Sequence, residues 1–123
     1  MLRVVHEGGA RFRADCRGHS LTLDQPEEDA GSDAGMTPPE LFAASLAGCV
    51  GYYVARYCQQ ADIDTAGLAA DCDWSVAEHP HRIGALRVGI TLPGLPDNRR
   101  KAVERAASLC LIHATLQHEP QVH

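Results

Sequence analysis

The chain has 123 residues, a formal net charge of −5 and eleven basic residues, of which Lys101 is the only lysine. This size predicts a single domain over residues 1–123, small enough that a partner chain could complete its core. The charge leaves no basic surface for nucleic acid, so we expect no nucleic-acid partner. The longest uncharged stretch, residues 41–55, is shorter than the roughly 20 apolar residues of a membrane span and predicts a buried helix, with no membrane partner.

The first residues and the number of cysteines both bear on where the protein is located. Arg3, His6 and Glu7 are not followed by an apolar run, so this segment does not resemble a secretion signal and we expect a cytoplasmic protein. Five cysteines are an odd number, which argues against a structural disulfide framework. Reduced thiols or a catalytic pair are the remaining interpretations.

The N-terminal third predicts an antiparallel meander followed by a loop. Residues 2–6, 10–14 and 20–23 are β-prone and are separated by Gly8-Gly9 and Gly18. Residues 25–36 are acidic and glycine-rich with almost nothing apolar to bury, and this composition predicts a mobile loop.

A long helix is expected next, from Thr37 to about Gln60. Thr37 is a helix N-cap in this prediction, Pro38 takes the first helical position, and Glu40 completes a Thr-x-x-Glu capping box. The small residues between positions 43 and 51 would let other elements approach the backbone closely. We therefore expect a central, enclosed helix.

The rest of the chain predicts a strand hairpin and two further helices, which makes the fold α+β. Residues 66–77 and 82–92 alternate as strands, with an exposed turn at residues 78–81. Asp97 or Asn98 is expected to cap a helix that ends near Cys110, followed by a short helix over residues 111–116. A last strand is expected at residues 120–123.

Cys49 and Cys110 stand in different local settings. Cys49 lies about twelve residues into its helix, beyond the reach of the helix dipole, so its activation would need a side chain from another element, with arginine the natural candidate. Cys110 lies at a break between helices and could contact backbone amides if the last helix begins there. The alternative interpretation of each is a small buried apolar residue.

The segment Thr37–Cys49, the following strand pair and the segment Cys110–Leu116 together resemble the OsmC/Ohr family of organic hydroperoxide reductases over nearly the whole chain. The resemblance implies an intertwined homodimer in which antiparallel sheets wrap around long central helices. It implies that Cys49 is the peroxidatic thiolate and Cys110 the resolving thiol. It also implies an organic hydroperoxide substrate and a dithiol reductant such as a lipoyl protein, without a cofactor.

The sequence departs from the family pattern at the residues that assist the cysteines. Pro39 occupies the position of a glutamate found ten residues before the family's peroxidatic cysteine, and Leu111 replaces a proline that often follows the second cysteine. Glu40 is nine residues before Cys49, half a turn out of phase on a helix, so we assign it to the cap. For the catalytic arginine, the turn Gly8–Arg11 resembles one branch of the family and indicates Arg11, with Arg13 and Arg17 as the next choices.

The remaining reactive side chains are interpreted as structural. Cys58 faces away from Cys49 on the same helix, and Cys16 and Cys72 lie in predicted strands. The histidines lack the spacing of a closed metal site, so no metal is expected. His113 could tune the Cys110 thiol or pack in the core. Tyrosines at the end of the long helix are expected to pack at the dimer interface or line a pocket: Tyr52, Tyr53 and Tyr57.

Two functions follow as hypotheses. The first is a homodimeric thiol peroxidase for organic hydroperoxides, in oxidative-stress defence, that uses Cys49 and Cys110. The second is a protein of the same fold that binds a small molecule or fatty acyl chain without full peroxidase activity. An arginine at the Cys49 sulfur would favour the first, and a purely apolar surrounding would favour the second.

Overall fold

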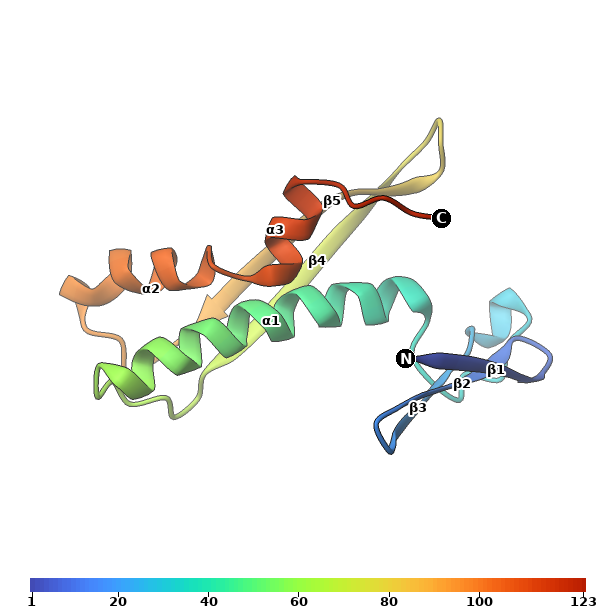
Figure 1. Cartoon of the computed structure of the whole chain (residues 1–123), viewed down its shortest axis with the longest axis horizontal. Helices are drawn as coiled ribbons and strands as arrows, with labels where there is room; N and C mark the ends of the chain where they lie inside the picture. The colour runs from blue at the N-terminus through green and yellow to red at the C-terminus, as the bar shows by residue number, and fades with distance from the viewer. The chain divides into compact units, whose positions relative to one another are not determined.

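The computed structural model describes all residues from 1 to 123 and contains helices and antiparallel strands (Figure 1). The chain divides into two compact units, residues 1–42 and residues 43–123, and the boundary falls within the long helix α1. The expected α+β class is confirmed. Each unit is described separately below.

The N-terminal unit contains the predicted meander as a three-stranded antiparallel sheet in the order β1-β2-β3. Its strands are β1 Arg3–Gly8, β2 Arg11–Cys16 and β3 His19–Leu23. Arg17 and Gly18 form the two-residue turn between β2 and β3, and both have positive φ angles, 52° and 79°. Positive φ at both central residues is the geometry of a tight hairpin whose twist matches that of its strands.

One face of this sheet is apolar and is not covered within the unit. Val4 pairs with Ala14, Ala14 pairs with Leu21, and Phe12 pairs with Leu23, so these side chains share one face of the pleat. Val4 remains 50% exposed and Leu21 42% exposed. Side chains of this kind usually lie against another surface.

The loop after β3 has more structure than its composition predicts. Asp24 is 2% exposed, and its carboxylate accepts hydrogen bonds from the N–H groups of Gln25, Ser32 and Ala34 at 2.8, 3.2 and 3.1 Å. A short 3₁₀ turn, η1 Glu27–Asp29, fills the middle of the loop. The expectation of a mobile loop is therefore corrected: one buried carboxylate replaces the missing apolar core by holding the backbone on both sides.

The helix α1 spans Pro38–Gln60, as predicted. Its capping box is present, because the Thr37 N–H donates to Glu40 Oε1 at 2.8 Å and the Glu40 N–H donates to Thr37 Oγ1 at 3.3 Å. No helix of the chain combines the length and apolarity that crossing a membrane would require. Tyr52 is 58% exposed, so an enclosed α1 stays a prediction.

The C-terminal unit contains the predicted hairpin of β4 Ala69–Ala77 and β5 Arg82–Thr91, which pair antiparallel with Cys72 opposite Val88. A 3₁₀ turn η2 Asp97–Arg99, the helix α2 Arg100–Ala107 and the helix α3 Leu111–Gln117 follow. Figure 1 shows α2 and α3 as separate helices with a change of direction between them.

Two expectations for this unit are wrong. Neither Asp97 nor Asn98 caps a helix, because both lie inside η2, whose N-cap is Pro96 without a side-chain hydrogen bond. Pro96 already fixes an extended backbone before the turn, which makes a side-chain cap unnecessary for starting it. Residues 120–123 form no strand and no strand ladder extends to them.

The core of the C-terminal unit consists of two apolar clusters along α1. The first contains Val54, Cys58, Ile63 and Val103, and the second contains Leu46, Val50 and Cys110. Cys49 packs against the second cluster, whereas Cys58 is fully buried in the first. The prediction that Cys58 is a packing residue is confirmed.

Candidate functional site

The structure brings Cys49 and Cys110 together, although they are 61 positions apart in the numbering of the chain. Cys49 lies in the middle of α1 and is half-buried, while Cys110 is fully buried at the junction of α2 and α3. Both belong to the cluster built around Leu46 and Val50. None of the five cysteines forms a disulfide in this structure.

Cys110 takes its position from the way the two short helices meet. The helix α2 ends at Ala107, and the N–H groups of Leu109 and Cys110 turn back to the carbonyls of Ala106 and Ala107 at 3.1 and 3.4 Å. Cys110 then leaves helical geometry, with φ −57° and ψ 125°, and serves as the N-cap of α3. Its Sγ accepts a hydrogen bond from the His113 N–H at 3.3 Å, the role that a serine or threonine oxygen has in other helices.

Hydrogen bonds at Cys49 favour its thiolate. Burial by itself would raise the pKa of Cys49, but the Cys110 thiol and the backbone N–H groups of Ile112 and Leu111 donate hydrogen bonds to its sulfur, and the net result is a pKa below the usual value. The first turn of α3 therefore supplies donors to a sulfur on α1. A lowered pKa increases the thiolate fraction, and the thiolate is the nucleophilic form of cysteine.

The pKa of Cys110 moves in the opposite direction. Burial raises it, and the hydrogen bond that its thiol donates to Cys49 raises it further, against a smaller opposing effect of the His113 and Ile112 N–H groups. The pKa values of the two thiols thus move apart, and the anion is favoured at Cys49 rather than at Cys110. This difference in pKa favours Cys49 over Cys110 as the attacking sulfur.

Backbone amides at Cys49 were not predicted. From the sequence, we expect such amides at Cys110 and an arginine at Cys49, because a residue in the middle of a helix lies beyond the reach of that helix's dipole. The start of a different helix, α3, provides the amides instead. The break in the helical pattern before Leu111 indicates free amides at the start of α3. Only the packing of α3 against α1 shows that these amides act on the Cys49 sulfur.

The predicted arginines lie in the N-terminal unit. Arg11 begins β2, and its Nε is 3.7 Å from a carboxylate oxygen of Glu7. Arg13 is paired with Asp15 at 3.0 Å and with Glu7 at 3.4 Å, and Arg17 lies in the hairpin turn. A role for any of them at the Cys49 sulfur stays a prediction.

The other predicted residues have structural contacts. Glu40 has a lowered pKa because its carboxylate accepts the backbone N–H and the side-chain hydrogen bond of Thr37, in keeping with its assignment to the cap. His113 contacts the Cys110 sulfur through its backbone N–H rather than through its ring. Burial raises the pKa of Cys58 and of Cys72, which disfavours their thiolates. No group of three His, Cys, Asp or Glu side chains is placed to hold a metal ion.

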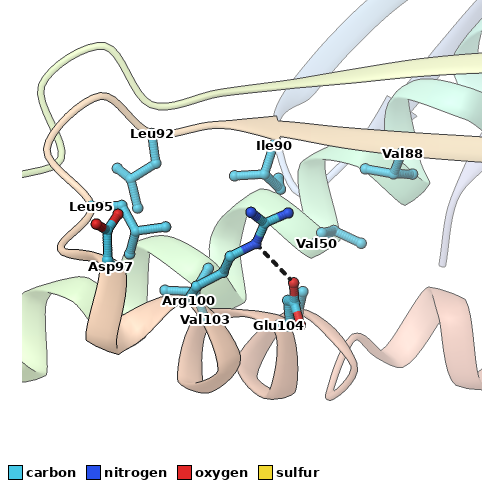
Figure 2. Close-up of a pocket in the computed structure, with 10 residues that line it drawn as sticks. Val50, Val88, Ile90, Leu92, Leu95, Asp97, Arg100, Val103 and Glu104 are labelled. Atoms are coloured by element: carbon cyan, nitrogen blue, oxygen red, sulfur yellow. Dashed lines mark hydrogen bonds and ion pairs between the residues drawn. The ribbon is translucent and has the colours of Figure 1, made fainter.

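A cavity of about 650 Å³ lies beside the thiol pair in the same unit (Figure 2). Val50 and Ala107, which contact the Cys110 cluster, also line this cavity. Its other walls are apolar residues of β5 and α2, while Asp97 and the ion pair Arg100–Glu104, at 3.3 Å, supply its polar groups. The volume falls within the roughly 300–1,000 Å³ of ligand sites in proteins.

These features define an α+β protein with two unlike cysteines at one apolar cluster, beside a cavity with apolar and charged walls. The family model described as OsmC-like protein matches residues 31–123, and the chain belongs to this family. Among curated proteins, none matches the chain. The resemblance read from the segments around Cys49 and Cys110 is confirmed.

Solved structures of the family have the same fold. A protein of Psychrobacter arcticus, described as an osmotic stress induced and detoxification response protein, is 25% identical, with a TM-score of 0.84 over 93% of this chain and 85% of that one. An OsmC-like protein of Mycoplasma pneumoniae is 19% identical, with a TM-score of 0.77 over 97% and 87% of the two chains. An organic hydroperoxide resistance protein OsmC of Legionella pneumophila is 20% identical, with a TM-score of 0.64 over 96% and 90%.

Proposed function

We propose that this protein is a thiol peroxidase that reduces organic hydroperoxides, with Cys49 as the attacking thiolate and Cys110 as the resolving thiol. One observation carries the proposal: Cys49 packs against the apolar cluster that contains Cys110. Hydrogen bonding by the Cys110 thiol and by the N–H groups of Ile112 and Leu111 lowers the pKa of Cys49, which supports its role as the attacking thiolate. Membership of a family that includes an organic hydroperoxide resistance protein adds support. The role in oxidative-stress defence is part of the same proposal.

In the first step the Cys49 thiolate attacks the terminal oxygen of the hydroperoxide. A sulfur–oxygen bond forms and the oxygen–oxygen bond breaks, with its electron pair going to the departing alkoxide, which takes a proton from water to become an alcohol. Cys49 is left as a sulfenic acid. The lowered pKa of Cys49 favours this step, because the thiolate is the form of cysteine that attacks.

In the second step Cys110 loses its proton to water and attacks the oxidised sulfur of Cys49. A disulfide forms and hydroxide leaves, to be protonated to water. Cys49 packs against the cluster that contains Cys110, and this supports the proximity that the step requires. A dithiol reductant, such as a lipoyl protein, then returns both cysteines to thiols by two exchanges and is itself oxidised to a disulfide.

The active form in this proposal is a homodimer. The uncovered apolar face of the N-terminal sheet, with Val4 and Leu21 half-exposed, supports a partner surface, as does the exposed Tyr52 of α1. A second copy would supply the cover that makes α1 a central helix. Arg11 is proposed to act at the Cys49 sulfur in this assembly.

Stopped-flow consumption of cumene hydroperoxide in the presence of a dithiol tests the function. Wild type is expected to turn over, Cys49→Ser to be inactive, and Cys110→Ser to consume about one equivalent and stop. Cys58→Ser is the matched control, because this thiol is buried in the other cluster, and it is expected to turn over like wild type. Full turnover by Cys49→Ser would overturn the proposal.

The second candidate function is that of a small-molecule or fatty-acyl binding protein. The cavity of about 650 Å³ with apolar walls favours it. Under this candidate the protein binds a fluorescent fatty-acid analogue with the same affinity in Cys49→Ser as in wild type, and neither protein consumes peroxide.

A further inference from the structure

The C-terminal unit has a second, smaller pocket that differs in character from the cavity beside the thiol pair. Its volume is about 270 Å³, and its lining residues come from the end of α1 and from α2 and the residues just after it: Tyr53, Arg56, Tyr57, Gln60, Ala106 and Leu109. The residues from α1 are spaced three or four apart and so lie on one face of the helix. Neither the thiol chemistry nor the larger cavity uses them.

The polar groups at this pocket are hydrogen-bond donors. Arg56 contributes a guanidinium, the two tyrosines contribute hydroxyls and Gln60 contributes a side-chain amide. Arg99 does not line the pocket, but its Nη1 donates to the hydroxyl of the lining residue Tyr57 at 3.2 Å, which brings a second guanidinium to the edge of the pocket. That hydrogen bond occupies the Tyr57 oxygen as an acceptor and leaves its own O–H to donate to another group.

The two guanidiniums have no carboxylate partner, although acidic residues outnumber basic ones by 16 to 11. The five ion pairs of the chain involve other cations, namely Arg11, Arg13, His81 and Arg100. The carboxylate nearest in sequence to Arg99, that of Asp97, lines the larger cavity instead, and Glu104 is paired with Arg100 there. The pocket therefore has positive charge that the chain does not neutralise.

We infer that this pocket binds a small organic carboxylate. Planar guanidiniums hold carboxylates through paired hydrogen bonds, and Tyr57 supplies a further donor beside Arg99. The rings of Tyr53 and Tyr57 and the side chains of Ala106 and Leu109 form apolar walls for the rest of the ligand. The volume lies just below the range of roughly 300–1,000 Å³ for drug-sized ligands, which limits the ligand to about one ring.

This site goes beyond the proposed peroxidase and does not depend on it. Neither Cys49 nor Cys110 lines this pocket, although Tyr53 also packs against the cluster that contains Cys110. Binding can therefore be measured on the reduced protein without peroxide. A failure of the peroxidase proposal would leave this binding unchanged.

Benzoate, a single ring with one carboxylate, is the probe, and benzamide is the uncharged probe of the same shape. Titration of the full-length, ¹⁵N-labelled protein followed by NMR is expected to shift the amide signals of residues 53–60 and 106–109 with benzoate. Benzamide is expected to bind about tenfold more weakly or not at all, because it cannot form the charged hydrogen bonds of the carboxylate. Inorganic phosphate is expected to bind more weakly than benzoate, since it cannot use the apolar walls.

Substitutions of Arg56 and Arg99 test whether these two guanidiniums bind the carboxylate. Arg56→Gln and Arg99→Gln are each expected to weaken benzoate binding about tenfold or more, and Arg56→Lys to fall between wild type and Arg56→Gln. Arg100→Gln is the matched control, because it removes an arginine of the neighbouring cavity, and it is expected to bind benzoate as wild type does. Equal binding of benzoate and benzamide, phosphate binding as tight as benzoate, or unchanged affinity in both Gln variants would overturn the inference.

Discussion

Cys49 packs against the apolar cluster that contains Cys110, and hydrogen bonding between the two thiols lowers the pKa of Cys49 while it raises that of Cys110. Cys110 is held in this position as the N-cap of α3, whose first amides also reach Cys49. One short helix therefore places the second thiol and stabilises the first as a thiolate. The placement of Cys110 and the lowered pKa of Cys49 can be tested separately.

Cys49 should lose its proton at a lower pH than Cys110. An ordinary cysteine has a pKa of about 8.5. Because hydrogen bonds lower the pKa of Cys49 while burial and the bond to Cys49 raise that of Cys110, alkylation of Cys49 should rise at a lower pH than alkylation of Cys110. Iodoacetamide labelling across pH 5–10, read by peptide mass spectrometry, measures both. Labelling of Cys110 at a lower pH than Cys49 would contradict the assignment of roles.

The donor role of Cys110 is tested by a matched pair of variants. Cys110→Ser keeps a hydroxyl that can donate to Cys49, whereas Cys110→Ala removes the donor. The pKa of Cys49 should therefore be higher in Cys110→Ala than in Cys110→Ser, measured as thiolate absorbance against pH with the other cysteines unchanged. The same Cys49 pKa in both variants would mean that the amides of α3 act alone.

The capping box predicts separate effects for Thr37 and Glu40. Thr37→Ala should lower the free energy of unfolding by about 1 kcal/mol, because the Glu40 N–H loses its acceptor. Glu40→Gln keeps an oxygen for the Thr37 N–H and should leave both stability and peroxide turnover nearly unchanged. Urea unfolding and stopped-flow turnover measure the two effects. A hundredfold slower turnover in Glu40→Gln would give this carboxylate a catalytic role.

Asp24 should make the stability of the loop dependent on pH. Its pKa is lowered because its carboxylate accepts the N–H groups of Gln25 and Ala34, so the stabilisation is fully present above the unfolded-state value of about 3.9 and is lost as the pH falls through the lower folded-state value. Asp24→Asn should therefore be less stable than wild type at pH 7, and the difference should shrink below pH 4.

The control for that measurement is Asp29→Asn, which makes the same change at an exposed position of the same loop. It should unfold at the wild-type urea midpoint at both pH values. A difference between wild type and Asp24→Asn that persists unchanged from pH 7 to pH 3 would show that the carboxylate charge is not the source of the stabilisation.

Local signals in the sequence were enough for most elements of the fold. The Thr37–Glu40 cap and the alternation on both sides of residues 78–81 predicted α1 and the β4–β5 hairpin, because these patterns depend on neighbours in the chain. The start of η2 was predicted wrongly because Asp97 and Asn98 are good caps in isolation, while Pro96 had already set the backbone. The order in residues 25–36 was missed because it depends on a single buried carboxylate.

The candidate site was predictable only in part. Cys49 and Cys110 were singled out by their segments, and the structure brings them together. The amides of Leu111 and Ile112 at Cys49 were not predicted, since their effect depends on how α3 packs against α1 rather than on any side chain. The pocket at Arg56 and Arg99 was also missed, because it joins residues 43 positions apart in the sequence.

The central claim is that Cys49 and Cys110 form one redox pair, and peptide mapping after oxidation tests it most directly. The reduced protein is treated with one equivalent of cumene hydroperoxide, digested without reductant and analysed by mass spectrometry. The prediction is a cross-linked peptide that joins Cys49 to Cys110 with the loss of two hydrogens, formed in wild type and absent in Cys49→Ser. Free thiols at both positions after the peroxide has been consumed would contradict the claim.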